Sequence, residues 1–367
     1  MPSASRDFTR EVVVLGDRPV RVVFGLGAMG GVAAEAGALG VRVLLISGSH
    51  ERTVGDTLAA ELGVRLAGRI HGVAPHVPVD VAADAVTLAR GLAVDVVIAL
   101  GGGSAVGLAK AVARKLDVSL LAVPTTYAGS EMTSIWGLTD HSGKVTGRDP
   151  RVLPRTVVYD PALTVSLPPA VTAASGMNAL AHALEALYSP DLTPEVGAVA
   201  EQALASLAAG LPGAVADGRD LAARAEALHG AWLAGWSLGG TTMGLHHKLA
   251  HLLGGRFRLP HAGVHSALLP QVADVNAQAA PAAFARAAGP LGVEGPHAVA
   301  PRLFDLAAEL GAPTSLAELG WGLEGVADVV EAALAAPVTH PRELGSADLD
   351  RLLRRAYAGS RPEGLRP

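Results

Sequence analysis

Short apolar runs rich in β-branched residues alternate with alanine-rich amphipathic segments through the first half of the chain. Runs of this length and composition predict strands, and the segments between them predict helices. The strand candidates span residues 11–15, 20–24, 41–47, 94–100 and 119–123, and the helix candidates span residues 28–39, 52–62, 80–92 and 104–115. Regular alternation of strands and helices predicts a parallel sheet with helices on both faces.

After residue 160 the strand patterns stop, and long amphipathic segments rich in alanine and leucine follow. Their periodicity predicts helices over residues 170–188, 194–211, 221–238, 244–253, 300–310 and 347–357. We therefore expect an α/β fold, in which a Rossmann-like dinucleotide-binding domain over residues 1–160 precedes an α-helical catalytic domain over residues 161–367. No run of about 18 consecutive apolar residues occurs, so no transmembrane helix is expected.

The composition narrows the possible functions. None of the 367 residues is cysteine, which excludes disulfides, thiolate nucleophiles and thiolate metal ligands. The net charge of −5 is spread along the chain without a basic block, which argues against a nucleic-acid partner and favours a small-molecule substrate. The first residues carry charges of both signs and no apolar stretch typical of a signal peptide, so a cytoplasmic location is expected.

A glycine-rich turn marks the candidate cofactor site. The apolar run 94–100 leads directly into Gly101, Gly102, Gly103 and Ser104, where a predicted helix starts. Backbone N–H groups that no Cβ obstructs, at the positive end of a helix, can bind a dinucleotide diphosphate. The simpler alternative is a tight corner between a strand and a helix. The spacing is not Gly-x-Gly-x-x-Gly, so a standard first-turn Rossmann site is not expected.

Hydroxyl side chains follow the next predicted strand, at the sheet edge where ligands of open α/β folds bind. The candidates for contacts to the nicotinamide ribose or the diphosphate are Thr125, Thr126, Tyr127 and Ser130. Such hydroxyls also cap helices and turns. Ser49, after an earlier strand candidate, is a further cofactor candidate, and the Ser47–Ser49 segment contains no acidic residue to bind a ribose 2′-hydroxyl. The choice between NAD and NADP therefore stays open.

Histidines and an amide form a second candidate site. Its members are Asn178, His182, His247, Lys248, His251 and His261. His247 and His251 are four residues apart, as are Asn178 and His182, so each pair shares one face of a predicted helix. Burying several imidazoles in so apolar a chain requires a metal, a ligand or a proton-transfer role, so we expect these side chains to converge. A single histidine on a helix face is more often a hydrogen-bonded core or surface residue.

Taken together, several motifs resemble those of the iron-containing alcohol dehydrogenase superfamily and, within it, the maleylacetate reductases. The motifs are Gly101-Gly-Gly-Ser104, Pro124-Thr-Thr-Tyr-Ala-Gly-Ser-Glu131, Tyr159-Asp-Pro161, Gly176-Met-Asn-Ala-Leu-Ala-His182, Gly244-Leu-His-His-Lys-Leu-Ala-His251 and Leu259-Pro-His261. The resemblance covers nearly the whole chain. Each motif is common alone, and the combination is specific.

The resemblance implies a set of metal-ligand positions. In the superfamily a divalent metal is held by one aspartate and three histidines, and the corresponding residues here are Asn178, His182, His247 and His261. An amide is a weaker ligand than a carboxylate, although three imidazoles could still hold Zn²⁺. Maleylacetate reductases share this asparagine and are thought to work without metal. We therefore expect no bound divalent metal, and NADH or NADPH as the cofactor.

The resemblance also implies the reaction, which is NAD(P)H-dependent reduction of the 2,3 double bond of maleylacetate to 3-oxoadipate in the catabolism of aromatic compounds. Hydride addition creates an enolate, which imidazolium or ammonium groups can stabilise and protonate. His251 or His247 is the candidate proton donor, and Lys144 and Arg148 are candidates for binding a substrate carboxylate. The alternative for the Lys144–Arg148 segment is a β-hairpin with solvated cations. The resemblance further implies a homodimer.

One position departs from the maleylacetate reductase pattern, because Gln271 stands where a histidine is expected. If that histidine binds a substrate carboxylate, the substrate of this chain differs from maleylacetate. Two alternatives therefore stay open. One is a metal-dependent alcohol or hydroxyacid dehydrogenase that tolerates Asn178 as a ligand, and the other is a biosynthetic, non-redox descendant that keeps the dinucleotide scaffold.

Overall fold

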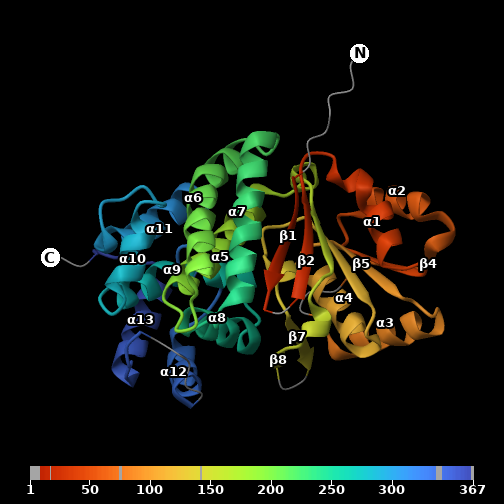
Figure 1. Ribbon diagram of the computed structural model, residues 1–367. Helices are drawn as coiled ribbons and strands as arrows, with labels where there is room; N and C mark the ends of the chain where they lie inside the picture. Colours follow the sequence, from red (N-terminus) through yellow and green to blue (C-terminus); the bar gives the residue numbers. More distant parts are fainter. Residues whose placement is uncertain (1–8, 17, 74–76, 141–142, 336–340, 365–367) are drawn as a thin grey trace. The chain divides into compact units, whose positions relative to one another are not determined.

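The structure is a computed structural model that describes residues 9–16, 18–73, 77–140, 143–335 and 341–364 (Figure 1). The chain divides into two compact units, residues 1–167 and residues 168–367. The change of composition in the sequence suggested a boundary at residue 160, whereas the first unit continues to Leu167.

The first unit contains a seven-stranded sheet in the order β1-β2-β9-β6-β5-β3-β4. The strands are β1 (Thr9–Leu15), β2 (Arg18–Phe24), β3 (Val43–Ser47), β4 (Leu66–His71), β5 (Val96–Gly101), β6 (Ser119–Pro124) and β9 (Thr156–Tyr159). The pairs from β2 to β4 are parallel, which confirms the expected parallel sheet for this part. The edge pair β1–β2 is antiparallel instead. Only residues 16 and 17 separate these two strands, and a parallel connection needs about a dozen residues or more.

Helices cover both faces of this sheet, as the sequence predicts. They are α1 (Val32–Leu39), α2 (Arg52–Leu62), α3 (Val79–Gly91) and α4 (Gly103–Leu116). On one face Leu44 and Ile46 of β3 pack in a cluster with residues of α3 and α4, while Val43 and Leu45 pack on the other face with residues of α1 and α2. Successive residues of a strand point to opposite faces, so the fully buried β3 serves two cores.

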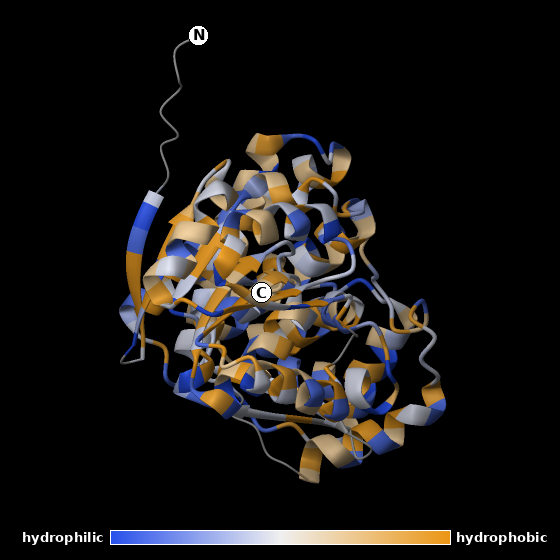
Figure 2. Ribbon diagram, turned by 90° about the vertical axis from the view of Figure 1, so that its right-hand side faces the viewer, coloured by the Kyte–Doolittle hydropathy of each residue, from blue (hydrophilic) through white to orange (hydrophobic). Residues whose placement is uncertain are grey.

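Two parts of the first unit have no clear signal in the sequence. β4 and β9 lie in the sheet, although neither has a long β-branched run. β7 (Ile135–Asp140) and β8 (Gly143–Arg148) form a separate antiparallel hairpin. The hairpin alternative for the segment around Arg148 is therefore the observed backbone structure. In Figure 2, the edge strand β1 begins with hydrophilic residues and ends with hydrophobic ones.

Every secondary-structure element described in the second unit is a helix, which confirms the predicted helical second half of the chain. The α-helices are α5 (Pro169–Leu187), α6 (Pro194–Ala216), α7 (Leu221–Gly240), α8 (Leu245–Arg256), α9 (His261–Ala277), α10 (Pro281–Ala288), α11 (Val299–Glu309), α12 (Val326–Ala335) and α13 (Ser346–Ala358). Helices α9, α10 and α12 were not predicted as separate segments.

Helices α6 and α7 pack against each other so closely that glycine is required at the contact. A Cβ built on Gly210 would lie 2.4 Å from the backbone nitrogen of Ala227, and one built on Gly230 would lie 2.8 Å from that of Leu207. By length and composition alone, α6 could span a membrane. In the structure its residues Ala203, Leu204, Leu207 and Leu211 are fully buried, so this apolar helix contributes to the core of the second unit.

Candidate active site

The glycine turn of the first unit is built as the sequence suggests, with β5 ending at Gly101 and α4 starting at Gly103. Gly101 has φ of 144°, and a Cβ there would lie 3.1 Å from Ala105 Cβ and 3.3 Å from the backbone nitrogen of Gly48. Gly103 is exposed, and a Cβ built on it would meet only Ala128 Cβ, at 3.9 Å. The first N–H groups of a helix have no partner within it, so this open backbone fits a diphosphate group.

The hydroxyl loop lies beside this turn. The backbone N–H of Thr125 donates to the Gly101 carbonyl at 3.3 Å, and a Cβ on Gly102 would lie 2.9 Å from Thr126 Cγ2. Thr126 and Ser130 are half-buried, whereas Thr125 and Tyr127 are buried. The structure therefore brings Gly101, Gly102, Thr125 and Thr126 together, while Tyr127 is fully buried.

An acidic residue that the sequence analysis passed over lies at the same sheet edge. The hydroxyl of Thr125 donates to Glu51 Oε1 at 2.7 Å. A Cβ built on Gly101 would lie 3.6 Å from Glu51 Oε2, so this carboxylate borders the glycine turn. Ser49 is exposed on the same connection. Glu51 lies two residues beyond Ser49 and immediately precedes α2, so it is the acidic residue nearest to the Ser47–Ser49 segment on its C-terminal side.

A buried lysine ties the hydroxyl loop to α4. Lys110 is 1% exposed, and its ammonium donates to the carbonyls of Ser130, Thr133 and Ile135 at 2.7, 2.8 and 2.7 Å and to the Thr133 hydroxyl at 3.0 Å. Burial lowers the pKa of Lys110 to about 7, and the nearby Glu131 carboxylate opposes this shift. The sequence signal was a lysine in an otherwise buried stretch of a predicted helix.

Glu131 is itself buried, and it accepts a hydrogen bond from the Tyr159 hydroxyl of β9 at 2.8 Å. Burial raises the pKa of Glu131, which its hydrogen bonds oppose. The segment from Ser130 to Ile135 is thus held from two sides, by α4 through Lys110 and by β9 through Tyr159.

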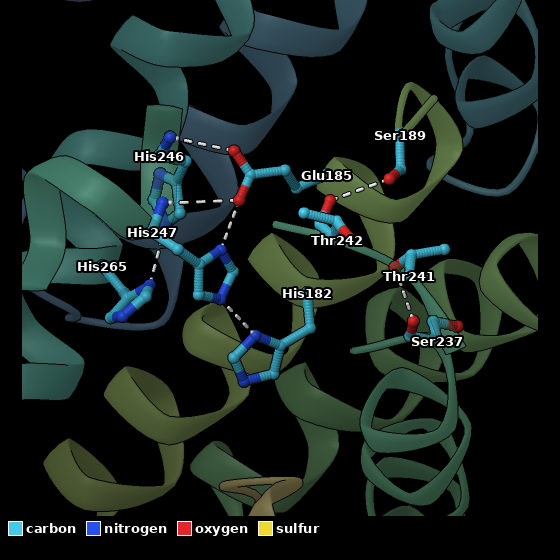
Figure 3. Close-up of polar contacts among 9 residues, drawn as sticks. All are labelled: His182, Glu185, Ser189, Ser237, Thr241, Thr242, His246, His247 and His265. Atoms are coloured by element: carbon cyan, nitrogen blue, oxygen red, sulfur yellow. Dashed lines mark hydrogen bonds and ion pairs between the residues drawn. The ribbon is translucent and has the colours of Figure 1, made fainter. Parts of the chain in front are cut away.

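The histidine site of the second unit is built from α5, α8 and α9 (Figure 3). Asn178, His182 and Glu185 follow one another at spacings of four and three on α5, so they share a face. His246 and His247 lie in the first turn of α8. The connection from α7 to α8 is fixed by hydrogen bonds from the Ser189 hydroxyl to the Thr242 carbonyl and from the Thr241 hydroxyl to the Ser237 carbonyl, both 2.7 Å.

Glu185 organises this site. It is 1% exposed and accepts the backbone N–H groups of His246 at 2.9 Å and His247 at 3.3 Å, together with Nδ1 of His247 (Figure 3). Burial raises the pKa of Glu185, and His246 and the N–H donors oppose the shift. As a carboxylate, Glu185 accepts from His247 Nδ1, and the Nε2 of a neutral His247 ring then accepts from His182 Nδ1 at 2.7 Å. The sequence analysis missed Glu185, although it lies one turn beyond His182.

A second imidazole pair lies alongside the first. His246 Nε2 and His265 Nδ1 are 2.8 Å apart, and both rings are fully buried. Burial lowers the pKa of His246 to about 3 and lowers that of His265 well below its usual value, and neighbouring histidines add to both shifts. Both rings are therefore neutral at pH 7. The opposite nitrogens, His246 Nδ1 and His265 Nε2, have no hydrogen-bond partner among the described residues.

His251 and His261 complete the cluster. Both are half-buried, and their rings stack with centroids 5.8 Å apart. The His261 ring lies 4.5 Å from that of His265, and the His251 ring lies 6.3 Å from that of His247. The rings at 182, 247, 251 and 261 thus belong to one contiguous group, with the half-buried Lys248 on the same helix as His247.

The arrangement does not form a metal-ligand set. His182 and His247 direct a nitrogen at each other, and no three His, Asp or Glu side chains group around a common point in the part of the chain that the structure describes. Asn178 is buried, and its carbonyl oxygen has no hydrogen-bond partner there. The absence of a bound metal stays a prediction.

The remaining candidates have other surroundings, or their side chains fall outside the described residues. Gln271, the departure from the expected histidine, is 2% exposed on α9 and donates from Nε2 to the Ser360 carbonyl at 2.6 Å. Its side chain therefore binds the segment that follows α13. Arg148 is exposed at the end of β8, and the side chain of Lys144 lies outside the described residues.

Comparison with known proteins agrees with this fold. The model of iron-containing alcohol dehydrogenase matches residues 19–161, and that of the Fe-containing alcohol dehydrogenase family, C-terminal, matches residues 172–357. The maleylacetate reductase of Sphingobium indicum is 46% identical over 94% of this chain and 97% of its own, and maleylacetate reductase 2 of Cupriavidus pinatubonensis is 48% identical over 94% and 96%. The crystal structure of maleylacetate reductase from a Rhizobium strain has a TM-score of 0.89 at 43% identity, covering 95% of this chain and 99% of that one. The chain therefore belongs to the iron-containing alcohol dehydrogenase family and is an oxidoreductase.

Proposed function

We propose that this chain reduces the 2,3 double bond of maleylacetate to 3-oxoadipate with NADH or NADPH. Similarity to maleylacetate reductases over nearly the full length supports the substrate. The observation that carries the chemistry is the hydrogen-bonded chain from Glu185 through His247 to His182, in which imidazoles bind each other and a carboxylate. Such an arrangement can donate or accept a proton and stabilise charge that develops on a bound substrate.

The proposed reaction assigns one role to the glycine turn of the first unit and another to the histidine cluster of the second unit. The backbone at Gly101–Ser104 binds the diphosphate, and Lys110 holds the hydroxyl loop beside it. When bound, the nicotinamide supplies a hydride to the alkene carbon β to the ketone. The histidine cluster stabilises the resulting enolate and protonates its α-carbon, which completes the saturated product. His251 is the proposed proton donor, because it is half-buried, whereas His246 and His265 are fully buried and neutral.

Purified, chelator-treated protein should oxidise NADH in the presence of fresh maleylacetate and form 3-oxoadipate, identified by mass spectrometry. His251→Gln should lower kcat by about 100-fold, the usual contribution of general acid catalysis. His229→Gln, a half-buried histidine of α7 outside the cluster, is the matched control and should retain full activity.

Two other outcomes would reject the proposal. Turnover that needs an added divalent metal, with oxidation of simple alcohols, would favour the metal-dependent alcohol dehydrogenase alternative. NADH binding without reduction of any enone would favour the non-redox alternative. A homodimer and a cytoplasmic location stay predictions that this experiment does not address.

We further propose that NADH is preferred over NADPH. The Glu51 carboxylate borders the glycine turn, and a carboxylate in such a place accepts a ribose hydroxyl and repels a 2′-phosphate. Glu51→Gln should raise kcat/KM for NADPH roughly tenfold relative to NADH, because one like charge is removed at short range. The exposed Glu61→Gln on α2 is the matched control. Unchanged relative kcat/KM values in both variants would remove Glu51 from cofactor recognition.

A further inference from the structure

A cavity of about 400 Å³ lies within the first unit, among α3, α4 and β7. Cavities of about 300 to 1,000 Å³ are typical of small-molecule sites. Its α4 wall runs from Gly107 to Lys115, along the middle and end of the helix, whereas the glycine turn lies at the start of α4. The proposed reaction makes no use of this cavity.

The walls of the cavity are mostly apolar, and one wall is an aromatic ring held in place. Val79, Val86 and Leu138 contribute aliphatic surface, and Trp136 of β7 contributes its indole. Trp136 pairs across the hairpin with Gly147, where an added Cβ would lie 2.8 Å from the indole. The Arg114 guanidinium lies 3.6 Å from the ring centroid. The indole is thus fixed before any ligand arrives, which limits the entropy lost on binding.

The described charged residues that line the cavity are all cations, namely Arg90, Arg114 and Lys115. Arg114 also faces Asp149 at 3.6 Å. Arg90 and Lys115 are exposed and form no ion pair with a residue that the structure describes. A ligand in this cavity would therefore meet apolar surface and a flat ring together with uncompensated positive charge.

We propose that this cavity binds an aromatic carboxylate. The flat, apolar body of such a molecule matches the aliphatic wall and the fixed Trp136 indole. Its anionic group matches Arg90 and Lys115, and no acidic side chain lines the cavity among the residues that the structure describes. Neither a neutral aromatic compound nor a simple inorganic anion would use both features.

The test is calorimetric titration of the full chain with 1-naphthoate, without cofactor or substrate. We expect one site, and binding at least tenfold weaker for neutral 1-naphthamide and for the double variant Arg90→Glu, Lys115→Glu. The charge-matched control is Arg155→Glu, Arg219→Glu, which reverses two exposed arginines outside the cavity and should bind like the parent. Ala83→Trp, at an exposed position in the wall, should block binding without charge reversal.

Several results would overturn the proposal. Equal affinity for the amide, or for the Arg90→Glu, Lys115→Glu variant, would show that the carboxylate is not recognised here. Absence of binding by the parent would reject the site. If the parent does not bind 1-naphthoate and the double variant sediments as a smaller species, the surface belongs to a contact between copies of the chain. Because the titration measures no turnover, its failure is distinguishable from failure of the proposed function.

Discussion

Replacing Lys110 with methionine is expected to lower the free energy of unfolding by about 3 kcal/mol, because three carbonyls and a hydroxyl lose their shared donor inside the first unit. Glu131 would also lose the nearby positive charge that favours its ionised form. The freed loop carries Ser130 and follows Thr125 and Thr126, so the dissociation constant for NADH should rise as well. Urea unfolding and NADH fluorescence titration measure the two effects.

Lys115→Met on the same helix is the control for the Lys110 prediction. Lys115 is exposed, so its loss should change the free energy of unfolding by no more than about 0.5 kcal/mol and leave NADH binding unchanged. If the Lys110 and Lys115 variants unfold at the same urea concentration, the ammonium does not hold the loop. A large loss of stability with an unchanged dissociation constant would limit Lys110 to a structural role.

Glu185→Gln should lower kcat/KM for maleylacetate by about 100-fold while the protein stays folded. A carboxylate accepts from three N–H groups at once, on two oxygens. An amide has one accepting oxygen, so its NH₂ group must face either the His246 N–H or the donors of His247. When the NH₂ group faces His247, that ring loses the partner that fixes its Nδ1–H tautomer, and His182 loses its acceptor, the His247 Nε2.

Three measurements separate this role of Glu185 from general damage. Circular dichroism should show a native helical spectrum, and ¹⁵N NMR of the imidazoles should show a changed tautomer at His247. Glu226→Gln, the same substitution at an exposed position of α7, should leave kcat/KM unchanged. Activity of the Glu185 variant within about threefold of the parent would contradict the proposed hydrogen-bonded chain.

The sequence predicts the elements whose pattern is local. Buried strands such as β3 and β5 are continuous apolar runs, and the long helices show clear periodicity, so most of both units was predictable. β9 was not, because four residues carry too little pattern. The antiparallel β1–β2 pair could have been predicted, since the connection between the runs is too short for a crossover.

The residues of the candidate site likewise fall into those that a local sequence pattern reveals and those that it does not. Asn178, His182, His247 and His251 were found because helical spacing relates residues within one segment. Glu185 and Lys110 were not, because their partners lie about twenty to sixty residues away and are brought close only by packing. For both residues, the one indication in the sequence is a charged side chain within an otherwise apolar helix. Such a side chain must have polar partners once it is buried, but the sequence does not show which residues they are.

The neutral pair His246–His265 has a consequence for how the enzyme attracts its substrate. At pH 7 these two rings contribute no positive charge, although they lie beside the other imidazoles. Glu185, which is buried in the same group, adds no positive charge either. Counting the histidines therefore overestimates the positive charge that attracts a dianion. The His246–His265 pair contributes a polar but uncharged surface to the interior of the cluster. Long-range capture of a dicarboxylate must depend on cations outside that interior, such as Lys248 at its border.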